Sequence, residues 1–391
     1  MDRALSRQNT KQKDLSQCGA DIFLTKTEID EEFLSKVVVQ LKKDRGERTR
    51  EDLNVIANLK EAFERNISKK PLKKQLVGFN LLENEYNFLS QNDKLLWVDY
   101  LIFRYKFRVY PLLKKLVEFP VYLLVEPVSY CNLKCSMCFQ VDKTFTRKPY
   151  LGHIDLGLFR KVIDEAVDGG CKALTMASRG EPLLHPKFSE LLKYVNGKFF
   201  DLKLNTNAML LSDEKARHIL ENEVTELVFS VDSYKKDEYE RIRKMGNFER
   251  VVSNIRRFHE IRSKEYPGSK CRTRVSGVKI APDFDTNGFV DFWKAIVDNV
   301  ACVPVENRWD TYNNKPSGRH SPCPILWERM YVWFDGVVNP CDVDYKSCLT
   351  TGDVTKLSLK DIWLGKEYSQ LREDHTKNKR LSRTPCDRCP F

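Results

Sequence analysis

The chain has 391 residues, a formal net charge of +11 and an apolar content of 41%. This length is long for one domain and predicts a core domain with additions. No apolar run approaches the ~20 residues that a membrane-spanning helix needs, which excludes an integral membrane protein and predicts a soluble one. The positive charge suits an anionic partner, such as a phosphorylated substrate, a nucleic acid or a membrane surface, although scattered surface lysine is the simpler explanation.

Residues 1–118 have the pattern of a helical N-terminal extension. The first 20 residues are polar, and we expect them to be disordered. After the helix-start signals at 27–32 and 49–52, apolar residues recur with a period close to 3.6. Alternating aromatic and basic residues at 103–115 could contact phosphates or lipid head groups, but packing beside the main domain is the favoured interpretation.

From residue 121 the pattern changes to alternating strands and helices. Six strand–helix units in series require a parallel sheet with right-handed crossovers. In such folds the loops at the C-terminal ends of the strands carry the chemistry, so we look for functional residues there. The predicted strands are 121–126, 173–177, 201–206, 226–231, 272–280 and 302–307, and the predicted helices are 156–169, 186–195, 212–221, 248–263 and 287–299.

Three cysteines follow directly on the first predicted strand. Cys131, Cys135 and Cys138 have the spacing Cys-x3-Cys-x2-Cys on one tight loop. Three thiolates suit a [4Fe–4S] cluster with one iron left open to bind and activate a small molecule, whereas a structural zinc site usually takes a fourth ligand nearby. A zinc knuckle or three unrelated core cysteines are the alternatives.

This loop resembles the signature of the radical S-adenosylmethionine (SAM) enzymes. The resemblance implies that the open iron chelates SAM, and that the reduced cluster cleaves it to methionine and a 5′-deoxyadenosyl radical that abstracts hydrogen from a substrate. It also implies an α/β fold with an open, partial (β/α)6 barrel of the TIM type, here at residues 119–318. The sequence departs from the commonest pattern at Met137, where an aromatic residue is frequent, and Phe139 could cover the cluster instead.

Polar residues at the later strand ends match the same family in order. The segment from Ser178 to Pro182 resembles the Gly-Gly-Glu-Pro motif that receives the SAM amino group, through Gly180 and Glu181, but Arg179 replaces the first glycine. Arg179 could instead point a cation at the substrate. Each match alone could be a turn or a helix cap. The resemblance assigns further SAM contacts to Asn205, Asn207, Ser230, Asp232 and Arg243.

A second group of cysteines lies in residues 319–391. Cys323 and Cys341 belong to a Cys-x12-Gly-x4-Cys element, and Cys386 and Cys389 to Cys-x2-Cys. Four thiolates fit a closed tetrahedral site, for which zinc is acceptable on spacing alone. The first element resembles the SPASM/twitch extension of radical SAM enzymes, which carries auxiliary [4Fe–4S] clusters. Because the full SPASM set has seven cysteines, we expect one auxiliary cluster in this small C-terminal iron–sulfur domain.

No residue stands out as the substrate base. Cys348, close in sequence to an expected cluster ligand, is a candidate hydrogen-atom donor for an epimerase, and Arg179 and His185 are further catalytic candidates. Cysteine is often a small buried hydrophobic residue. This is the default expectation for Cys348 as well as for Cys171, Cys271 and Cys302.

Four functions are compatible with these patterns and with the resemblance to radical SAM enzymes. The first is oxidation of an alcohol in a sugar, aminocyclitol or nucleotide-linked sugar, with the auxiliary cluster as electron acceptor and flavodoxin or ferredoxin as electron donor. Alternatives are peptide or protein modification (epimerisation, cross-linking or side-chain oxidation) and a redox-neutral sugar epimerase. A non-enzymatic nucleic-acid or membrane module with a zinc-stapled C-terminus is the last. Cysteines in two tight groups argue for metal rather than disulfides, so we expect a reducing, cytoplasmic location.

Overall fold

The computed structural model describes residues 29–68, 78–280, 283–305 and 310–389. The chain divides into two compact units, residues 1–104 and 105–390. This division falls before the expected boundary at 118, because the second half of helix α4 packs on the sheet of the second unit, where the Phe107 ring centroid lies 5.8 Å from that of Tyr122. The expected disorder of residues 1–20 lies outside the described residues.

The first unit is helical, as the sequence predicts. Its first helix begins at Asp30, whose side chain accepts a hydrogen bond from Phe33 N. The second begins with a reciprocal capping box between Thr49 and Asp52. The helices are α1 (Glu31–Lys43), α2 (Arg50–Ile67), α3 (Glu83–Gln91) and the first part of α4 (Trp97–Leu113).

The second unit is built on a nine-stranded sheet in the order β11-β10-β9-β1-β3-β4-β5-β7-β8. The strands from β9 to β8 are parallel, whereas β10 and β11 extend the sheet in antiparallel fashion. The predicted α/β class is therefore confirmed, and the C-terminal hairpin joins the same sheet beside β1. The strands are β1 (Tyr122–Val125), β3 (Ala173–Met176), β4 (Asp201–Thr206), β5 (Glu226–Ser230), β7 (Arg272–Lys279), β8 (Asn299–Pro304), β9 (Arg329–Val332), β10 (Val337–Asn339) and β11 (Gly352–Asp353).

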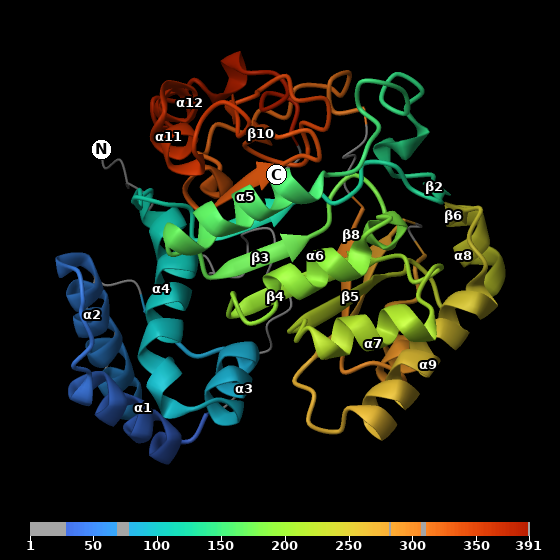
Figure 1. The fold of residues 1–391 in the computed structure, drawn as a ribbon. Helices are drawn as coiled ribbons and strands as arrows, with labels where there is room; N and C mark the ends of the chain where they lie inside the picture. Colours follow the sequence, from blue (N-terminus) through green and yellow to red (C-terminus); the bar gives the residue numbers. More distant parts are fainter. Residues whose placement is uncertain (1–28, 69–77, 281–282, 306–309, 390–391) are drawn as a thin grey trace, which may run out of the picture. The chain divides into compact units, whose positions relative to one another are not determined.

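Helices follow the strands and cover one face of the sheet, as Figure 1 shows for α5, α6 and α7 in front of β3, β4 and β5. Short polar side chains cap several of them, including Asp155, Ser212 and Asn247. Helix α8 was not predicted, because seven residues are too few to show a helical period. These helices are α5 (Leu156–Asp168), α6 (Phe188–Val195), α7 (Asp213–Glu221), α8 (Lys236–Ile242), α9 (Phe248–Glu265) and α10 (Thr286–Lys294).

The other face of the sheet, which we call the inner face, carries polar side chains. Along β4, and along β7 as far as Gly277, buried and half-buried residues alternate, because successive side chains of a strand point to opposite faces. Leu202 and Leu204 belong to the buried set, and Lys203 and Arg274 to the half-buried set. The sheet therefore offers charged groups on the face that its helices leave uncovered.

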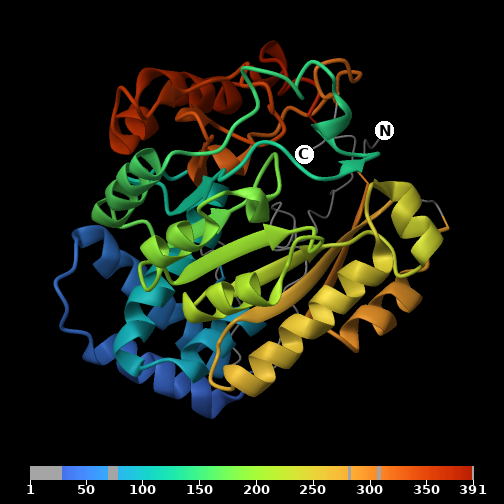
Figure 2. The same ribbon diagram turned by 45° about the vertical axis from the view of Figure 1, so that its right-hand side comes forward.

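The C-terminal part of the chain contains helices α11 (Leu359–Leu364) and α12 (Lys366–Thr376). It is tied to the barrel by Leu359 N, which donates to Glu165 Oε2 at 2.7 Å. Figure 2 shows this part, in orange and red, beside the loop that follows β1. Among the residues that the structure describes, no helix is long and apolar enough to cross a membrane.

Candidate active site

Cys131, Cys135 and Cys138 lie together on the loop after β1. Burial, the charge of Glu181 and the neighbouring thiols of Cys135 and Cys138 raise the pKa of the Cys131 thiol to about 12. The loop is closed by a hydrogen bond from Cys138 N to Cys135 O at 3.0 Å. Leu133 N donates to Cys131 Sγ at 3.4 Å. Three buried or half-buried thiols on one loop, one of them with a backbone N–H aimed at its sulfur, are a donor set that fits a [4Fe–4S] cluster.

A short pair of strands holds the cysteine loop in place. β2 (Lys134–Cys135) pairs antiparallel with β6 (Arg243–Lys244), so that Cys135 lies opposite Arg243. Arg243 Nη1 donates to Cys135 Sγ at 3.8 Å, and its Nε lies 2.7 Å from Asp232 Oδ2. Asp232 is 0% exposed and also accepts from Val278 N at 2.9 Å. The ends of β5 and β7 thus hold the arginine that contacts the cysteine loop.

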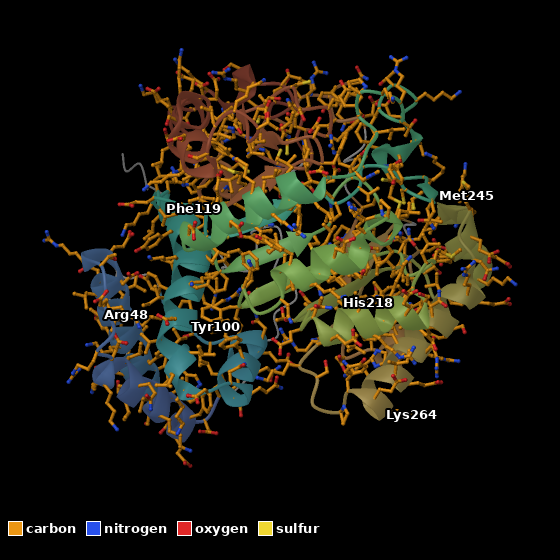
Figure 3. All side chains as sticks on the ribbon, in the orientation of Figure 1. Arg48, Tyr100, Phe119, His218, Met245 and Lys264 are labelled. Atoms are coloured by element: carbon orange, nitrogen blue, oxygen red, sulfur yellow. The ribbon has the colours of Figure 1, made fainter. Side chains whose placement is uncertain are left out.

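Figure 3 shows Met245 at the outer end of the β2–β6 pair. This side chain is 71% exposed and its φ is +72°. The two cations before it behave differently, since Arg243 is buried and Lys244 is exposed. Only Arg243 is therefore directed into the site.

Gly180 occupies a position that leaves no room for a Cβ atom. A Cβ at this position would lie 2.3 Å from Val128 O and 2.4 Å from Tyr130 O, both in the backbone that leads to Cys131. Its neighbour Glu181 is buried, and its N–H donates to Tyr130 O at 3.0 Å. The motif after β3 is therefore packed directly against the start of the cysteine loop.

The Glu181 carboxylate organises the end of β4. One oxygen accepts from Thr206 Oγ1 at 2.7 Å, and the other accepts from Asn207 N at 2.8 Å. Asn207 Nδ2 then donates to Asn132 Oδ1 at 2.9 Å and lies 3.7 Å from Cys131 Sγ. Burial outweighs these bonds and raises the pKa of Glu181. This carboxylate links the cysteine loop to the strand ends, a role that the sequence did not indicate.

Buried polar atoms that lack a partner in the described part of the protein mark room for a ligand. Asn205 Oδ1 on β4 and Ser178 Oγ after β3 are two such atoms. Ser178 has a φ of +139°, which an L-residue rarely adopts. Ser230 lies at the end of β5, half-buried beside Ser276 of β7. Hydroxyl and amide groups at adjacent strand ends fit the amino, carboxylate and ribose groups of SAM.

Two of the three catalytic candidates are held inside the protein. Arg179 is 3% exposed and forms a two-pronged salt bridge with Glu126, through Nε at 2.7 Å and Nη2 at 2.5 Å. It therefore does not point a cation outward to a substrate. Both ring nitrogens of His185 are used by backbone, Nε2 at 2.9 Å from Ile154 O and Nδ1 accepting from Lys187 N at 3.1 Å. Burial lowers the pKa of His185.

The third candidate, Cys348, lies in the segment after Cys341 and is exposed, so the default expectation that it is a buried cysteine is wrong. Its N–H donates to Asp344 Oδ1 at 2.9 Å. Burial and then the charge of Asp344 raise the pKa of its thiol. Cys171, Cys271 and Cys302 are buried, as the sequence predicts.

The four C-terminal cysteines come together from two distant segments. Burial and the charges of Cys386 and Cys389 raise the pKa of Cys341, and burial and the charge of Cys323 raise that of Cys386 to about 12. Arg380 ties the two segments, because its Nη1 donates to Ser321 O at 2.9 Å and its Nε donates to Cys386 O at 3.4 Å. Four adjacent thiols beside a buried cation fit an iron–sulfur cluster.

None of the described cysteines forms a disulfide. Among residues 29–68, 78–280, 283–305 and 310–389, no three His, Cys, Asp or Glu side chains are grouped as the ligands of one metal ion. A cubane cluster differs from a single ion in this respect, because each thiolate binds a separate iron.

Two residues of the site were missed by the sequence analysis. Glu126 directly follows β1 and is 0% exposed. It is the one charged residue in the apolar run 121–126, which was a signal. Tyr345 stacks on Phe139 with ring centroids 4.8 Å apart. The prediction that Phe139 could cover the cluster had no means of finding this partner, since more than 200 positions separate the two residues.

The fold and the site define an iron–sulfur enzyme that uses SAM. The model of the radical SAM superfamily matches residues 125–272, and that of the SPASM iron–sulfur cluster-binding domain matches residues 323–390. The chain therefore belongs to the radical SAM superfamily and carries a C-terminal SPASM domain. A [4Fe–4S] cluster with SAM in the barrel and auxiliary iron–sulfur at the C-terminus are its cofactors. The zinc-stapled, non-enzymatic alternative does not agree with these matches.

Curated relatives cover only part of the chain. A tungsten-containing aldehyde ferredoxin oxidoreductase cofactor-modifying protein of Pyrococcus furiosus is 35% identical over 28% of this chain and 30% of its own. A GTP 3′,8-cyclase of Clostridium perfringens is 27% identical over 48% and 54%. A serine-type anaerobic sulfatase-maturating enzyme of Bacteroides thetaiotaomicron is 34% identical over 35% and 36%. The chain thus spans about half, or less, of the length of each relative.

Two solved structures share the fold. SuiB of Streptococcus suis, bound to S-adenosylmethionine, has a TM-score of 0.51 and 16% identity over 90% of both chains. The structure titled anSMEcpe with bound AdoMet has a TM-score of 0.52 and 16% identity over 69% of this chain and 85% of its own. These likenesses confirm the partial barrel.

Proposed function

We propose that this protein is a radical SAM enzyme that oxidises an alcohol in a small, polar, anionic substrate of the sugar, aminocyclitol or nucleotide-sugar type. One electron and one proton would leave the alcohol together as a hydrogen atom taken up by the 5′-deoxyadenosyl radical, the second electron would pass to the auxiliary cluster, and the hydroxyl proton would pass to solvent water, which leaves a carbonyl. When bound, the SAM-loaded cluster supplies a radical that abstracts hydrogen, and the auxiliary cluster supplies an electron acceptor. The observation that carries the substrate class is the charge on the inner face of the sheet.

Three charged side chains from adjacent strands meet on the inner face of the sheet. Glu226 Oε2 lies 2.9 Å from Lys203 Nζ, and Glu226 Oε1 lies 2.8 Å from Arg274 Nε. Burial alone would raise the pKa of Glu226, but the two cations outweigh it and hold that pKa well below its usual range. These three side chains contribute two positive charges and one negative charge.

Arg274 has the geometry for binding an anion. Its Nε is engaged by Glu226, which fixes the plane of the guanidinium and leaves the two terminal nitrogens on the other edge. That edge suits a carboxylate or a phosphate. Arg274 lies two residues before Ser276, which is paired with Ser230 at the expected SAM contact. An anionic group bound by Arg274 would hold the rest of the substrate near SAM.

The other residues of the site would prepare it rather than react. Glu181 holds the turn that carries Asn207, and Asn207 and Arg243 direct N–H groups at two cysteine sulfurs. Donors of this kind would orient the thiolates and offset the negative charge of a bound cluster. No described side chain of the site has to act as a base for hydrogen abstraction by a radical.

Peptide or protein modification is the second candidate. It is favoured by the sequence similarity to the sulfatase-maturating enzyme, whose name indicates a protein substrate. The redox-neutral epimerase has weaker support, because its candidate donor Cys348 lies at the exposed surface.

The test uses the anaerobically reconstituted holoprotein with three sets of compounds: phosphorylated or nucleotide-linked sugars, the same sugars without phosphate, and short peptides. Release of 5′-deoxyadenosine above the substrate-free rate, with a product that has lost two hydrogens, should appear in the first set. Because a charge-assisted hydrogen bond contributes about 1.5–3 kcal/mol, Arg274→Gln should raise KM at least about tenfold for that substrate. Turnover of peptides alone would show the alternative to be correct.

A further inference from the structure

A single residue of the C-terminal domain, Tyr345, contacts both segments that form the SAM site, one through its side chain and the other through its backbone carbonyl. The Tyr345 ring stacks on Phe139 at 4.8 Å with an angle of 18° between the rings, and meets the edge of Phe145 at 5.4 Å. Its hydroxyl donates to Asp142 Oδ2 at 2.9 Å, and its carbonyl accepts from Arg179 Nη1 at 2.9 Å. We call these five residues the Tyr345 cluster.

The members of the cluster lie next to the residues that hold the cofactors. Phe139 directly follows Cys138, and Asp142 ends the 3-10 turn that continues from it (Phe139–Val141). Arg179 directly precedes Gly180, and Tyr345 lies four residues after Cys341. The Tyr345 cluster therefore joins the cysteine loop, the motif after β3 and the segment of an auxiliary ligand at one point.

The contacts of Arg179 account for an arginine at a position where the family has glycine. Its guanidinium lies 4.2 Å from the centre of the Trp333 ring, and Glu126 neutralises it inside the protein. Gln140, in the turn after Cys138, donates Nε2 hydrogen bonds to Arg179 O at 2.5 Å and to Ser129 O at 2.7 Å. A glycine at 179 would have no side chain to reach the Tyr345 carbonyl.

The segment that presents Tyr345 is shaped around Cys341. Asn339 Nδ2 donates to Cys341 O at 2.7 Å and to Asp344 O at 2.9 Å. The buried Asp344 carboxylate accepts from Leu349 N at 2.7 Å and from Tyr312 Oη at 2.8 Å. Lys346 Nζ adds an ion pair with Asp142 at 2.7 Å. Movement of Cys341 would therefore displace Tyr345 and its contacts.

We infer that Tyr345 and Arg179 are positioning residues that couple the two cofactor sites. A loaded auxiliary site fixes residues 341–347, and the Tyr345 cluster then holds the Cys131–Cys138 loop in the geometry that binds SAM. The inference rests on the assignment of both cofactor sites, and it concerns SAM binding before any substrate is present. It gives the C-terminal domain a role in building the SAM site in addition to any role as electron acceptor.

The test measures SAM binding and the electron paramagnetic resonance (EPR) signal of the reduced SAM-side cluster in the full-length, reconstituted protein. Tyr345→Ala removes the stack and the hydroxyl, and Tyr345→Phe is the matched control that keeps the stack. Cys386→Ala/Cys389→Ala removes the auxiliary site, and Cys348→Ser is the control for an exposed cysteine in the same segment. Hydrogen exchange of residues 131–142 reports on the loop itself.

We expect Tyr345→Ala and Cys386→Ala/Cys389→Ala to bind SAM at least about tenfold more weakly, as the loss of one or two ordered contacts predicts. Both should show faster exchange at 131–142 and a smaller SAM-induced change in the EPR signal, whereas Tyr345→Phe and Cys348→Ser should remain close to wild type. Wild-type affinity and exchange in the first two variants would overturn the inference. If Tyr345→Ala loses its iron, SAM binding is measured in Arg179→Lys instead. Unchanged SAM binding in that variant would also overturn the inference. Since no substrate enters the assay, failure here leaves the proposed reaction untouched.

Discussion

Arg179 and Gly180 are neighbours that serve opposite needs at the end of β3. The arginine fills space with a buried, paired charge, whereas the glycine is required because the carbonyls of Val128 and Tyr130 occupy the place of a Cβ. Backbone atoms cannot move aside as the end of a flexible side chain can, so the second requirement is strict. Individual residues of this site are thus chosen by packing as much as by chemistry.

Gly180→Ala should destabilise the protein by about 1–3 kcal/mol or more, the usual cost of overpacking, and should reduce the iron bound at the SAM-side site. The measurement is the midpoint of thermal unfolding together with iron content. Gly268→Ala is the control, because nothing lies within 4 Å of the Cβ that it would add. Equal stability of the two variants would contradict the prediction.

His259 on α9 should make stability depend on pH. Its Nδ1 accepts from Arg262 Nη2 at 3.0 Å, and its Nε2 lies 3.1 Å from Thr273 Oγ1. Burial and then the charge of Arg262 lower its pKa to about 4. In the unfolded chain the pKa returns to about 6.5, so the unfolded state takes up a proton first and stability falls as pH decreases from about 6.5 to about 4.

The check compares thermal unfolding of wild type and His259→Gln at about pH 7 and about pH 5, on either side of the pKa in the unfolded chain. Wild type should lose more stability on acidification than the variant, because glutamine does not titrate. Parallel curves would show that this histidine is not the responsible group.

At the scale of elements, the short β2–β6 pair determines where the cysteine loop lies. Both strands have only two residues, and their pairing depends on the buried ion pair between Arg243 and Asp232. Ser136 N adds a hydrogen bond to Ile242 O at 2.9 Å. Such a small pair has little stability of its own, so the ion pair beneath it decides whether it forms.

Arg243→Gln should cost about 3–5 kcal/mol, because it leaves the Asp232 carboxylate buried without its partner. Hydrogen exchange at 131–139 should become faster, and thermal unfolding should shift to lower temperature. Lys244→Gln, at the exposed neighbouring position of the same strand, should change neither quantity. If both variants behave alike, the ion pair is not what holds the loop.

For the whole molecule, the two sets of cysteines imply two separate cluster sites. Removing the cysteines of one site should therefore leave the iron bound at the other site in place, even if the Tyr345 cluster couples their geometry. We expect about eight irons per chain after anaerobic reconstitution, and about four in the Cys131→Ala/Cys135→Ala/Cys138→Ala variant, because each [4Fe–4S] cluster holds four. Iron and acid-labile sulfide are measured together. About four irons falling to none, with zinc retained, would make the C-terminal site structural and remove the proposed electron acceptor.

The sequence by itself determined the cofactor class and most of the secondary structure. Cys-x3-Cys-x2-Cys is a local pattern, since ligand spacing on one loop is a matter of a few residues, and the alternating strand and helix periods from residue 121 are local as well. The segment around Gly180 and Glu181 was found for the same reason. Helix α8 was missed and β8 was placed a few residues late, because short elements give weak periodic signals.

Only the tertiary structure decided which of the candidate residues face the site. Arg179 and His185 were catalytic candidates on residue type, but their burial and their partners, Glu126 and the backbone at Ile154, lie far away in sequence. The contact between Tyr345 and Phe139 and the joining of β9 to β1 likewise depend on segments that meet only in the folded chain. Long-range packing sets the environment of each side chain, and the environment determines whether the same chemical group braces the protein or acts on a ligand.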